Sequence, residues 1–182
     1  MAWVEGVGDY ILCSGDVAFL DEVFPAIERF LALCAGHLHG PGCFVPPAWS
    51  WHFVDWGEVD RRPYSLAQQA LLAVAVQSAI AMARFRTAAV PGRWIDLQTR
   101  VRRGLEAFYD PETGWYRGHL DPEASERFRT LYLGPACDHS GCVPRHGNAL
   151  LLAAGLTPPE RVAALGRQLA RHLENAPDRA FG

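Results

Sequence analysis

Residues 66–83 read LAQQALLAVAVQSAIAMA, so Ala, Leu, Val and Ile lie on nearly every side of the helix that this segment predicts. A helix that is apolar all round must be covered all round by the rest of the protein. The sequence therefore predicts a core helix here. Asn148–Leu156 is a shorter segment of the same kind, and Trp3–Leu12 is a candidate for a third.

Three other segments have one apolar and one charged face. Apolar residues recur at steps of three or four over Asp16–Ala35, Arg93–Phe108 and Pro158–Glu174, which is typical of an amphipathic helix with one buried face. The residue types at the helix starts also predict side-chain caps. These caps are Asp16 for the first amphipathic helix, Thr157 with Glu160 for the last, and Ser65 with Gln68 for the core helix.

Core and amphipathic helices alternate along the chain, joined first by a tight turn and then by a long loop. The amphipathic helices begin near residues 16, 92 and 158, and the long loops run over about 36–62 and 110–145. Repeated helical hairpins pack by stacking on their neighbours. The alternation favours an all-α double layer, an α/α toroid with the core helices inside, and an ordinary solenoid of hairpins is the competing arrangement. Both arrangements place the long loops together at the N-terminal ends of the inner helices.

Composition bounds the class of protein. At 182 residues the chain is one domain, and a formal net charge of −3 gives no reason to expect a nucleic-acid partner. The longest nearly apolar run, Ala70–Ala83, is shorter than the roughly 20 residues of a membrane span, so no membrane partner is expected. No signal peptide is visible, and the compartment stays open.

Five cysteines, an odd number, do not suggest a disulfide framework. P-loop, dinucleotide-binding and GxSxG motifs are missing from the sequence, and no cofactor is expected.

The first long loop concentrates aromatic rings and acids. It holds Trp49, Trp51 and Trp56 together with Asp55 and Glu58. Aromatic rings on loops are typical of binding surfaces. Flat rings beside carboxylates suit a sugar, because its C–H faces stack on the ring while its hydroxyls bond the charged groups. The alternative is that these rings pack the loop onto the helix ends. The second loop adds Trp115, Tyr116, His119, Arg127, Arg129, Tyr132, His139, Arg145 and His146.

Glycoside hydrolysis uses two carboxyl groups, about 6.5–9.5 Å apart in an inverting enzyme and about 5–5.5 Å apart in a retaining one. The spacing of the loop acids does not select a pair, so the catalytic residues stay unknown at this point. The acids on the two loops are Asp55, Glu58, Asp60, Glu112, Asp121, Glu123 and Glu126.

Two rival patterns lead to weaker hypotheses. Four residues that bind zinc in other proteins lie between residues 137 and 146, but their spacing differs from that of the common structural zinc modules, so no metal site is predicted. Arginines gather between residues 84 and 103, but Asp96 and Glu106 among them favour a solvated outer face over a nucleic-acid surface. The possible zinc ligands are Cys137, His139, Cys142 and His146.

Three blocks of the sequence resemble bacterial α-L-rhamnosidases. VGDYILCSGD at residues 7–16 is similar to the family's DYxxxTGD block, WHFVDWG at 51–57 to its WxFxDW loop, and RHGNAL at 145–150 to its QHxNAL helix. The blocks occur in the family's order and span nearly the whole chain. The sequence departs from the family at Arg145, where Gln is usual, and in a Cys-containing insertion at 136–143.

The resemblance implies a single partial six-hairpin glycosidase domain over residues 1–182. Three of the six (α/α)6 hairpins are expected, at about 1–37, 64–108 and 146–175. An incomplete ring of this kind leaves inner helices uncovered on two flanks. The resemblance also implies that the general acid and the general base lie outside these residues, in the rest of the parent glycosidase chain.

The sequence therefore predicts a portion of an inverting glycoside hydrolase of the α-L-rhamnosidase type, with a carbohydrate substrate and no activity by itself. The alternative is a non-catalytic helical-repeat module that binds carbohydrate or serves as a scaffold. In the family, the loop tryptophan that contacts sugar falls on Trp56. The residues expected to contact sugar are Trp56, Asp55, Trp51, Trp49 and His146.

Overall fold

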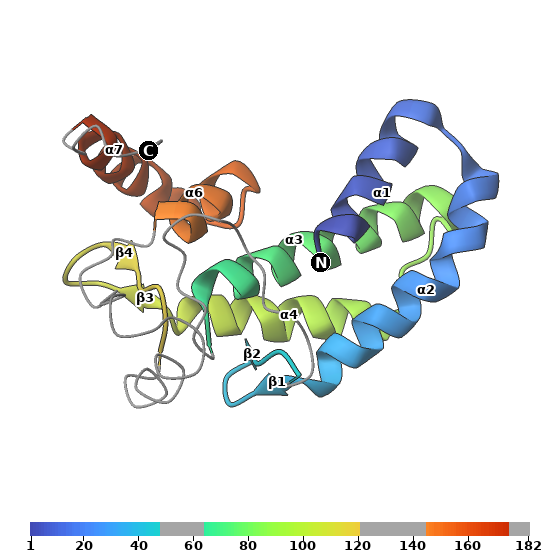
Figure 1. Cartoon of the computed structure of the whole chain (residues 1–182), viewed down its shortest axis with the longest axis horizontal. Coiled ribbons are helices and arrows are strands. Elements are labelled where there is room, and N and C mark those ends of the chain that lie inside the picture. The colour runs from blue at the N-terminus through green and yellow to red at the C-terminus, as the bar shows by residue number, and fades with distance from the viewer. Residues whose placement is uncertain (48–63, 121–144, 175–182) are drawn as a thin grey trace, which may run out of the picture.

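The computed structural model describes residues 1–47, 64–120 and 145–174, which are helical apart from two short β-hairpins and the connecting turns (Figure 1). The predicted all-α class is confirmed, and the arrangement of hairpins is that of an incomplete, toroid-like fragment. The elements are α1 (Ala2–Ser14), α2 (Val17–Gly36), β1 (Leu38–His39), β2 (Cys43–Phe44), α3 (Leu66–Thr87), α4 (Gly92–Glu106), β3 (Tyr109–Asp110), β4 (Trp115–Tyr116), α6 (Arg145–Ala153) and α7 (Pro159–Glu174).

Helix α3 lies at the centre of the described fold and packs against α1, α2, α4 and α6 (Figure 1). By length and composition it is apolar enough to cross a membrane. However, 78% of its most apolar 18-residue stretch is buried inside the protein, as in a core helix. The prediction of a core helix is confirmed, but α3 is not covered all round, because Gln77 and Ala81 are exposed. The helix continues past Ala83 to Thr87, and its last turn carries Arg84 and Arg86, whose positive charge suits the C-terminal end of a helix.

Helices α1 and α6 both pack on α3, towards opposite ends of it, and are not covered all round (Figure 1). In α1, Val4 and Ile11 are buried, whereas Leu12 is 85% exposed. The prediction that Trp3–Leu12 and Asn148–Leu156 are fully covered core helices was wrong for the described structure, because α1 packs mainly on α2 and α3 and α6 mainly on α3 and α7. Their open sides are those expected at the two flanks of an incomplete ring. The buried residues of α6 are Gly147, Asn148 and Leu151.

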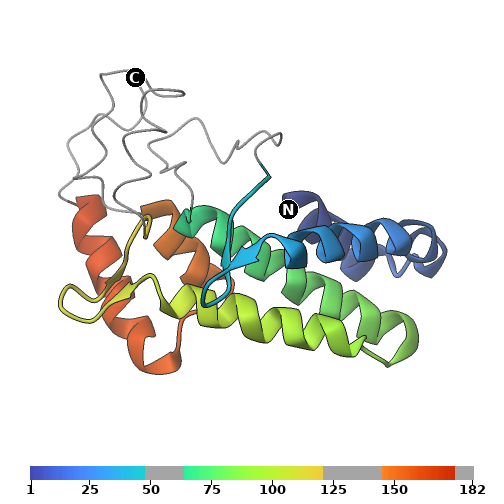
Figure 2. The same cartoon turned by 90° about the horizontal axis from the view of Figure 1, so that it is seen from below.

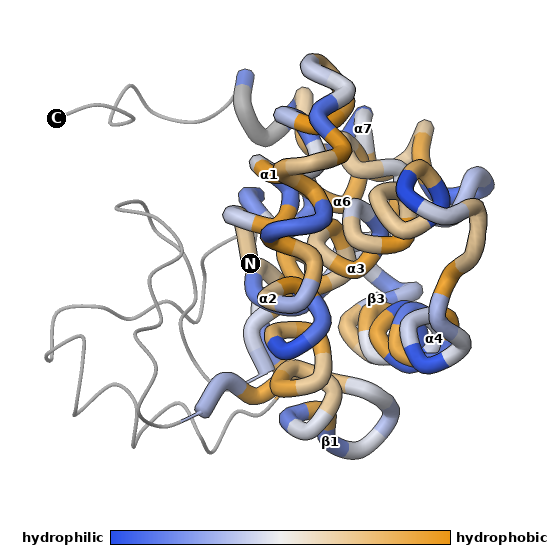
Figure 3. The backbone as a smooth tube through the Cα atoms, turned by 90° about the vertical axis from the view of Figure 1, so that its right-hand side faces the viewer, coloured by the Kyte–Doolittle hydropathy of each residue, from blue (hydrophilic) through white to orange (hydrophobic). Residues whose placement is uncertain are grey.

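The three amphipathic helices form where the periodicity predicts them, as α2, α4 and α7. Figure 2 shows α3 and α4 running antiparallel side by side, and Figure 3 shows hydrophobic and hydrophilic residues together on α4. The predicted cap of α2 is confirmed, since the Asp16 carboxylate accepts the Phe19 N–H at 3.0 Å. The residues buried along α2 are Leu20, Phe24, Ile27, Leu31 and Cys34, and those along α4 are Trp94, Leu97, Val101, Gly104 and Leu105.

The two predicted capping boxes do not form. The Ser65 side chain makes no cap bond to α3, and the buried Gln68 Oε1 has no hydrogen-bond partner among the described residues. One N–H group in the first turn of α3 has a different partner: the Leu66 N–H donates to the Gly118 carbonyl oxygen at 2.9 Å. At the start of α7, the buried Thr157 hydroxyl likewise has no partner within the described part of the chain. At the start of α3, the described bond to the helix end thus comes from a distant part of the chain and not from the predicted side-chain cap.

The β1–β2 hairpin lies against α4 at a distance that only glycine permits. A Cβ atom at Gly104 would overlap the carbonyl oxygen of Gly42 and lie 2.5 Å from Gln69 Nε2. A Cβ atom at Gly42 would overlap the carbonyl oxygen of Arg100, and Gly42 also has a φ of 116°, which favours glycine. This close approach fixes the hairpin on the last turn of the helix.

We expect Gly104→Ala to lower the free energy of unfolding by about 1–3 kcal/mol, because the added methyl group forces the hairpin away from α4. The matched control is Gly166→Ala in α7, where nothing lies within 4 Å of an added Cβ. This control should stabilise the protein by roughly 0.5–1 kcal/mol through helix propensity. Urea unfolding of both variants checks the pair, and equal effects in the two variants would contradict the close approach.

Candidate functional site

The described parts of both long connections meet at the start of α3. Each connection begins with an antiparallel hairpin directly after an outer helix, β1–β2 after α2 and β3–β4 after α4. The first hairpin is bonded to α3 through Phe44, and the second connection reaches the same helix end through Gly118. The prediction that long connections gather at the N-terminal ends of the inner helices holds for these parts. We call this end of the molecule the rim, made of residues 42–45, 64–69, 115–119 and 145–148.

Gln69 of α3 holds the first hairpin. Its side chain is fully buried, and its Oε1 accepts the Phe44 N–H at 2.7 Å. Its Nε2 donates to the carbonyl oxygens of Gly42 at 3.0 Å and of Val101 at 2.9 Å. Buried backbone groups need partners, and each one left unsatisfied costs about 1–3 kcal/mol. One amide therefore joins the core helix, the hairpin and α4.

Asn148 of α6 holds the second hairpin in the same way. It is fully buried, its Oδ1 accepts the Tyr116 N–H at 3.0 Å, and its Nδ2 donates to the Tyr116 carbonyl oxygen at 2.9 Å. The sequence analysis gave no role to Gln69 or Asn148, which we call the two anchor amides. The available signal was a side-chain amide as the fourth residue of each of two helices whose following residues are apolar.

Arg161 of α7 joins the second hairpin to the outer layer. Its guanidinium carbon lies 3.7 Å from the centroid of the Tyr109 ring, and the group donates to Tyr116 Oη at 3.1 Å and pairs with Glu106 at 2.8 Å. Burial raises the pKa of Tyr116, and the bond from Arg161 only partly opposes it, so the phenol is neutral. Because Tyr116 is 1% exposed, it packs the loop onto the helix ends instead of presenting a ring to a ligand.

Asp110 is the described carboxylate most strongly tied into the rim hairpins. Desolvation alone would raise its pKa, but the Glu112 N–H at 3.0 Å and Arg117 at 3.3 Å outweigh this, and the pKa of Asp110 lies below its ordinary value. A general acid needs a pKa near the working pH. Asp110 is therefore a structural carboxylate and not a proton donor. The other described loop acid, Glu112, is exposed in the β3–β4 turn.

Most of the predicted sugar-binding residues fall outside the described part of the chain: these are Trp49, Trp51, Asp55 and Trp56. His146 is described, and it lies exposed as the second residue of α6, next to Asn148 at the rim. Trp115 is half-buried and packs against the core. The structure brings His146 and Trp115 to the rim and leaves the predicted aromatic cluster untested. The second-loop residues that lie outside the described part are Arg127, Arg129, Tyr132 and His139.

The rival patterns receive no support from the described residues. Three of the four possible zinc ligands, Cys137, His139 and Cys142, lie outside them, and the described residues hold no group of three or more potential metal ligands. Two of the clustered arginines are neutralised on the surface, since Arg86 pairs with Asp21 and Arg93 pairs with Glu28.

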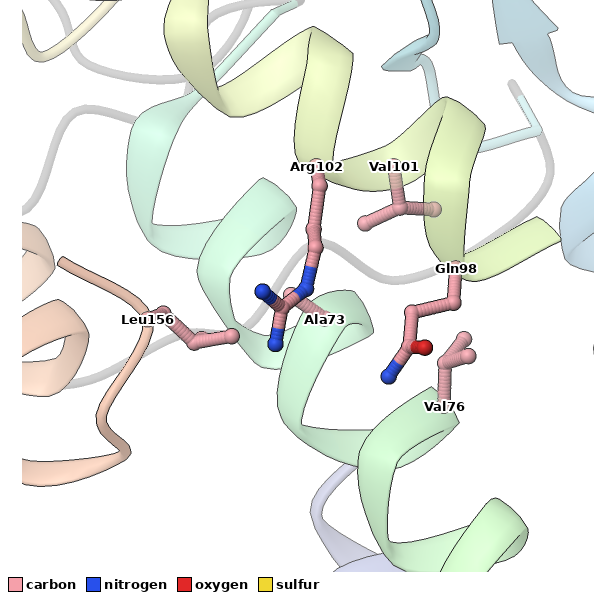
Figure 4. A pocket seen from close by; sticks show the side chains of 6 residues that line it. All are labelled: Ala73, Val76, Gln98, Val101, Arg102 and Leu156. Carbon is pink, nitrogen blue, oxygen red and sulfur yellow. The ribbon is translucent and has the colours of Figure 1, made fainter. Parts of the chain in front are cut away.

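A groove away from the rim lies between α3, α4 and the turn from α6 to α7. Figure 4 shows Gln98 and Arg102 of α4 and Leu156 of the turn around the α3 residues of this groove. It has no space for a water molecule, so it is a packing seam and not a binding pocket. Its lining is Ala73, Val76, Gln98, Val101, Arg102 and Leu156.

No known protein family matches this sequence, and no curated protein matches it either. Among solved structures, the chain is similar to a GH78 family rhamnosidase of Bacillus sp. GL1, with a TM-score of 0.69 and 16% sequence identity. The similarity covers 97% of this chain and 17% of that chain, so this chain spans a small part of the rhamnosidase's length. At this identity the likeness shows the fold alone.

We expect Asp110→Asn to lower the free energy of unfolding at about pH 7, where the lowered pKa of Asp110 keeps it charged beside Arg117. The stabilisation by charged Asp110 is fully present above the pKa that Asp110 has in the unfolded chain. It is lost as the pH falls through the lower pKa that Asp110 has in the folded protein. Wild type and variant should therefore converge at about pH 3 or below in urea unfolding. The matched control, Asp96→Asn on the exposed face of α4, should show no such convergence; a wild-type advantage over Asp110→Asn that persists in acid would contradict the ion pair.

Proposed function

We propose that this chain is a sugar-binding portion of a glycoside hydrolase of the α-L-rhamnosidase type. The observation that carries the proposal is the meeting of both long connections at the rim, on a fold similar to a stretch of a GH78 rhamnosidase. Loops held together at one end of a rigid helical layer are the usual place for a binding site. The three sequence blocks that resemble the family support the same conclusion.

The proposed reaction is inverting hydrolysis of a terminal sugar, with one carboxyl group as general acid and another as general base. Asp110, with its lowered pKa, is unsuited to the acid role. As the family resemblance implies, the proposal assigns both catalytic carboxyl groups to regions outside this chain. The part of the chain at the rim supplies binding and orientation of the sugar.

Sugar contact is assigned to Trp56, Trp51 and Trp49 as stacking rings, and to Asp55 and His146 as hydrogen-bonding groups. His146 supports this assignment by its exposure at the start of α6. A stacked ring covers the apolar face of a sugar, while a carboxylate or imidazole beside it bonds the hydroxyls.

The domain organisation is part of the same proposal. Residues 1–182 form one partial six-hairpin domain, with hairpins at about 1–37, 64–108 and 146–175. The exposed side of α1, where Tyr10 is 48% and Leu12 85% exposed, supports this view, because such a face needs a neighbour. The rest of the parent chain is the proposed neighbour.

The test is isothermal titration of the full-length protein with L-rhamnose. Trp56→Ala should weaken binding at least tenfold, because about 1.4 kcal/mol of stacking is lost. The matched control is Phe85→Ala, an exposed aromatic residue in the last turn of α3 and so at the opposite end of that helix from the rim, which should bind as wild type does. Equal affinity of Trp56→Ala and wild type would contradict the assigned role. Binding without hydrolysis by the full-length protein would favour the non-catalytic module.

A further inference from the structure

The two hairpins are built in the same way, although their sequences differ. Gly42 and Gly114, both with positive φ, lie two residues before Phe44 and Tyr116, which end the second strands. The residue that follows each second strand donates its N–H to the carbonyl oxygen of the residue that precedes the first strand. These bonds are Val45 to His37 at 3.0 Å and Arg117 to Phe108 at 2.7 Å.

The anchor amides also occupy equivalent positions. Gln69 and Asn148 are each the fourth residue of an inner helix, and each bonds the N–H of the last residue of the preceding second strand. In both cases the other edge of that strand pairs with the first strand of the hairpin. An amide side chain, with one acceptor and one donor group, thus takes the place of a neighbouring strand.

We propose that Gln69 and Asn148 are positioning residues, each of which sets the register in which one long connection leaves its hairpin and enters the rim. The bonds of Gln69 fit only one register, because a slip by one residue turns the Phe44 side chain from the core to solvent. Phe44 is 4% exposed and Tyr116 is 1% exposed, so either slip loses a buried aromatic ring. The direction of the chain at Val45 and at Arg117 is fixed as a result.

The two anchor amides act independently. Gln69 bonds the first hairpin and α4, and Asn148 bonds the second hairpin. These bonds of Gln69 and these bonds of Asn148 share no residue. A change at one anchor therefore affects its own connection and leaves the other connection in place.

Hydrogen–deuterium exchange of the full-length protein tests this directly. Gln69→Asn shortens the side chain by one methylene, so the amide no longer reaches all three partners. It should speed exchange at least tenfold in residues 37–47 and leave residues 108–119 unchanged. Asn148→Ser should do the reverse. The control, Gln77→Asn, makes the same change on the exposed face of α3, where the amide lies 3.5 Å from the Ala154 carbonyl oxygen, and should change neither.

Faster exchange in both hairpins and throughout the helices would show general destabilisation and overturn the proposal, as would unchanged exchange in the hairpin next to the altered anchor. If a variant does not fold, hydrogen exchange of the unaltered protein still tests the proposal. Its Phe44 and Tyr116 amides should then exchange at least tenfold more slowly than those in the turns at residues 40–42 and 111–114. Equal rates at these positions would overturn the proposal.

A second measurement rests on the proposed function. In titration with L-rhamnose, Gln69→Asn should weaken binding at least tenfold, and Gln77→Asn should not change it. If the unaltered protein does not bind L-rhamnose, the proposed function fails while the exchange measurement still decides the positioning role. If it binds and Gln69→Asn binds equally well despite faster local exchange, the register of the first connection does not position the site and this part of the inference is wrong.

Discussion

The fold depends on one constraint, the need to cover α3 on every side. A helix with almost no polar face is stabilised by removing its surface from water. Each Å² of apolar area buried in this way contributes about 25 cal/mol. Four helices, α1, α2, α4 and α6, cover most of α3 and leave a narrow strip at Gln77 and Ala81 exposed. Outer helices then need only a single apolar stripe, and this explains why α2 and α4 carry charge on the opposite face. The layering of the molecule follows from the composition of one segment.

Covering an apolar helix creates a second problem where the chain crosses between layers. The crossing backbone passes over the helix ends, where its N–H and C=O groups are cut off from water and must find partners. Among the described residues, the two short hairpins satisfy some of these groups, and the anchor amides Gln69 and Asn148 satisfy others. The polar residues inside α3 and α6 are therefore consequences of the long connections. A fully apolar first turn in either helix would leave the neighbouring strand edge unsatisfied.

Periodicity in the sequence predicted the helices well, because spacing of apolar residues is a local property. The Asp16 cap was also predictable, since its partner Phe19 is three residues away. The Ser65 cap does not form, and the nearest bond to this helix end comes from Gly118, far away in sequence, which accepts the Leu66 N–H. The Thr157 cap fails because α7 begins at Pro159, one residue later than this cap needs. The anchor amides escaped prediction because Gln69 bonds residues 25 to 32 positions away. Burial of α1 was overestimated because composition does not reveal which neighbours are present.

The two ends of α3 are held by different kinds of interaction. Near the short turn to α4, exposed ion pairs join Arg86 to Asp21 and Arg93 to Glu28, and pairs of this kind contribute about 0–1 kcal/mol each. At the rim, buried amides make bonds whose loss leaves unsatisfied groups and costs more. Apolar contact stabilises both ends equally well but specifies position poorly, whereas buried hydrogen bonds specify it. Directional bonds are therefore concentrated at the end where the position of the long connections matters.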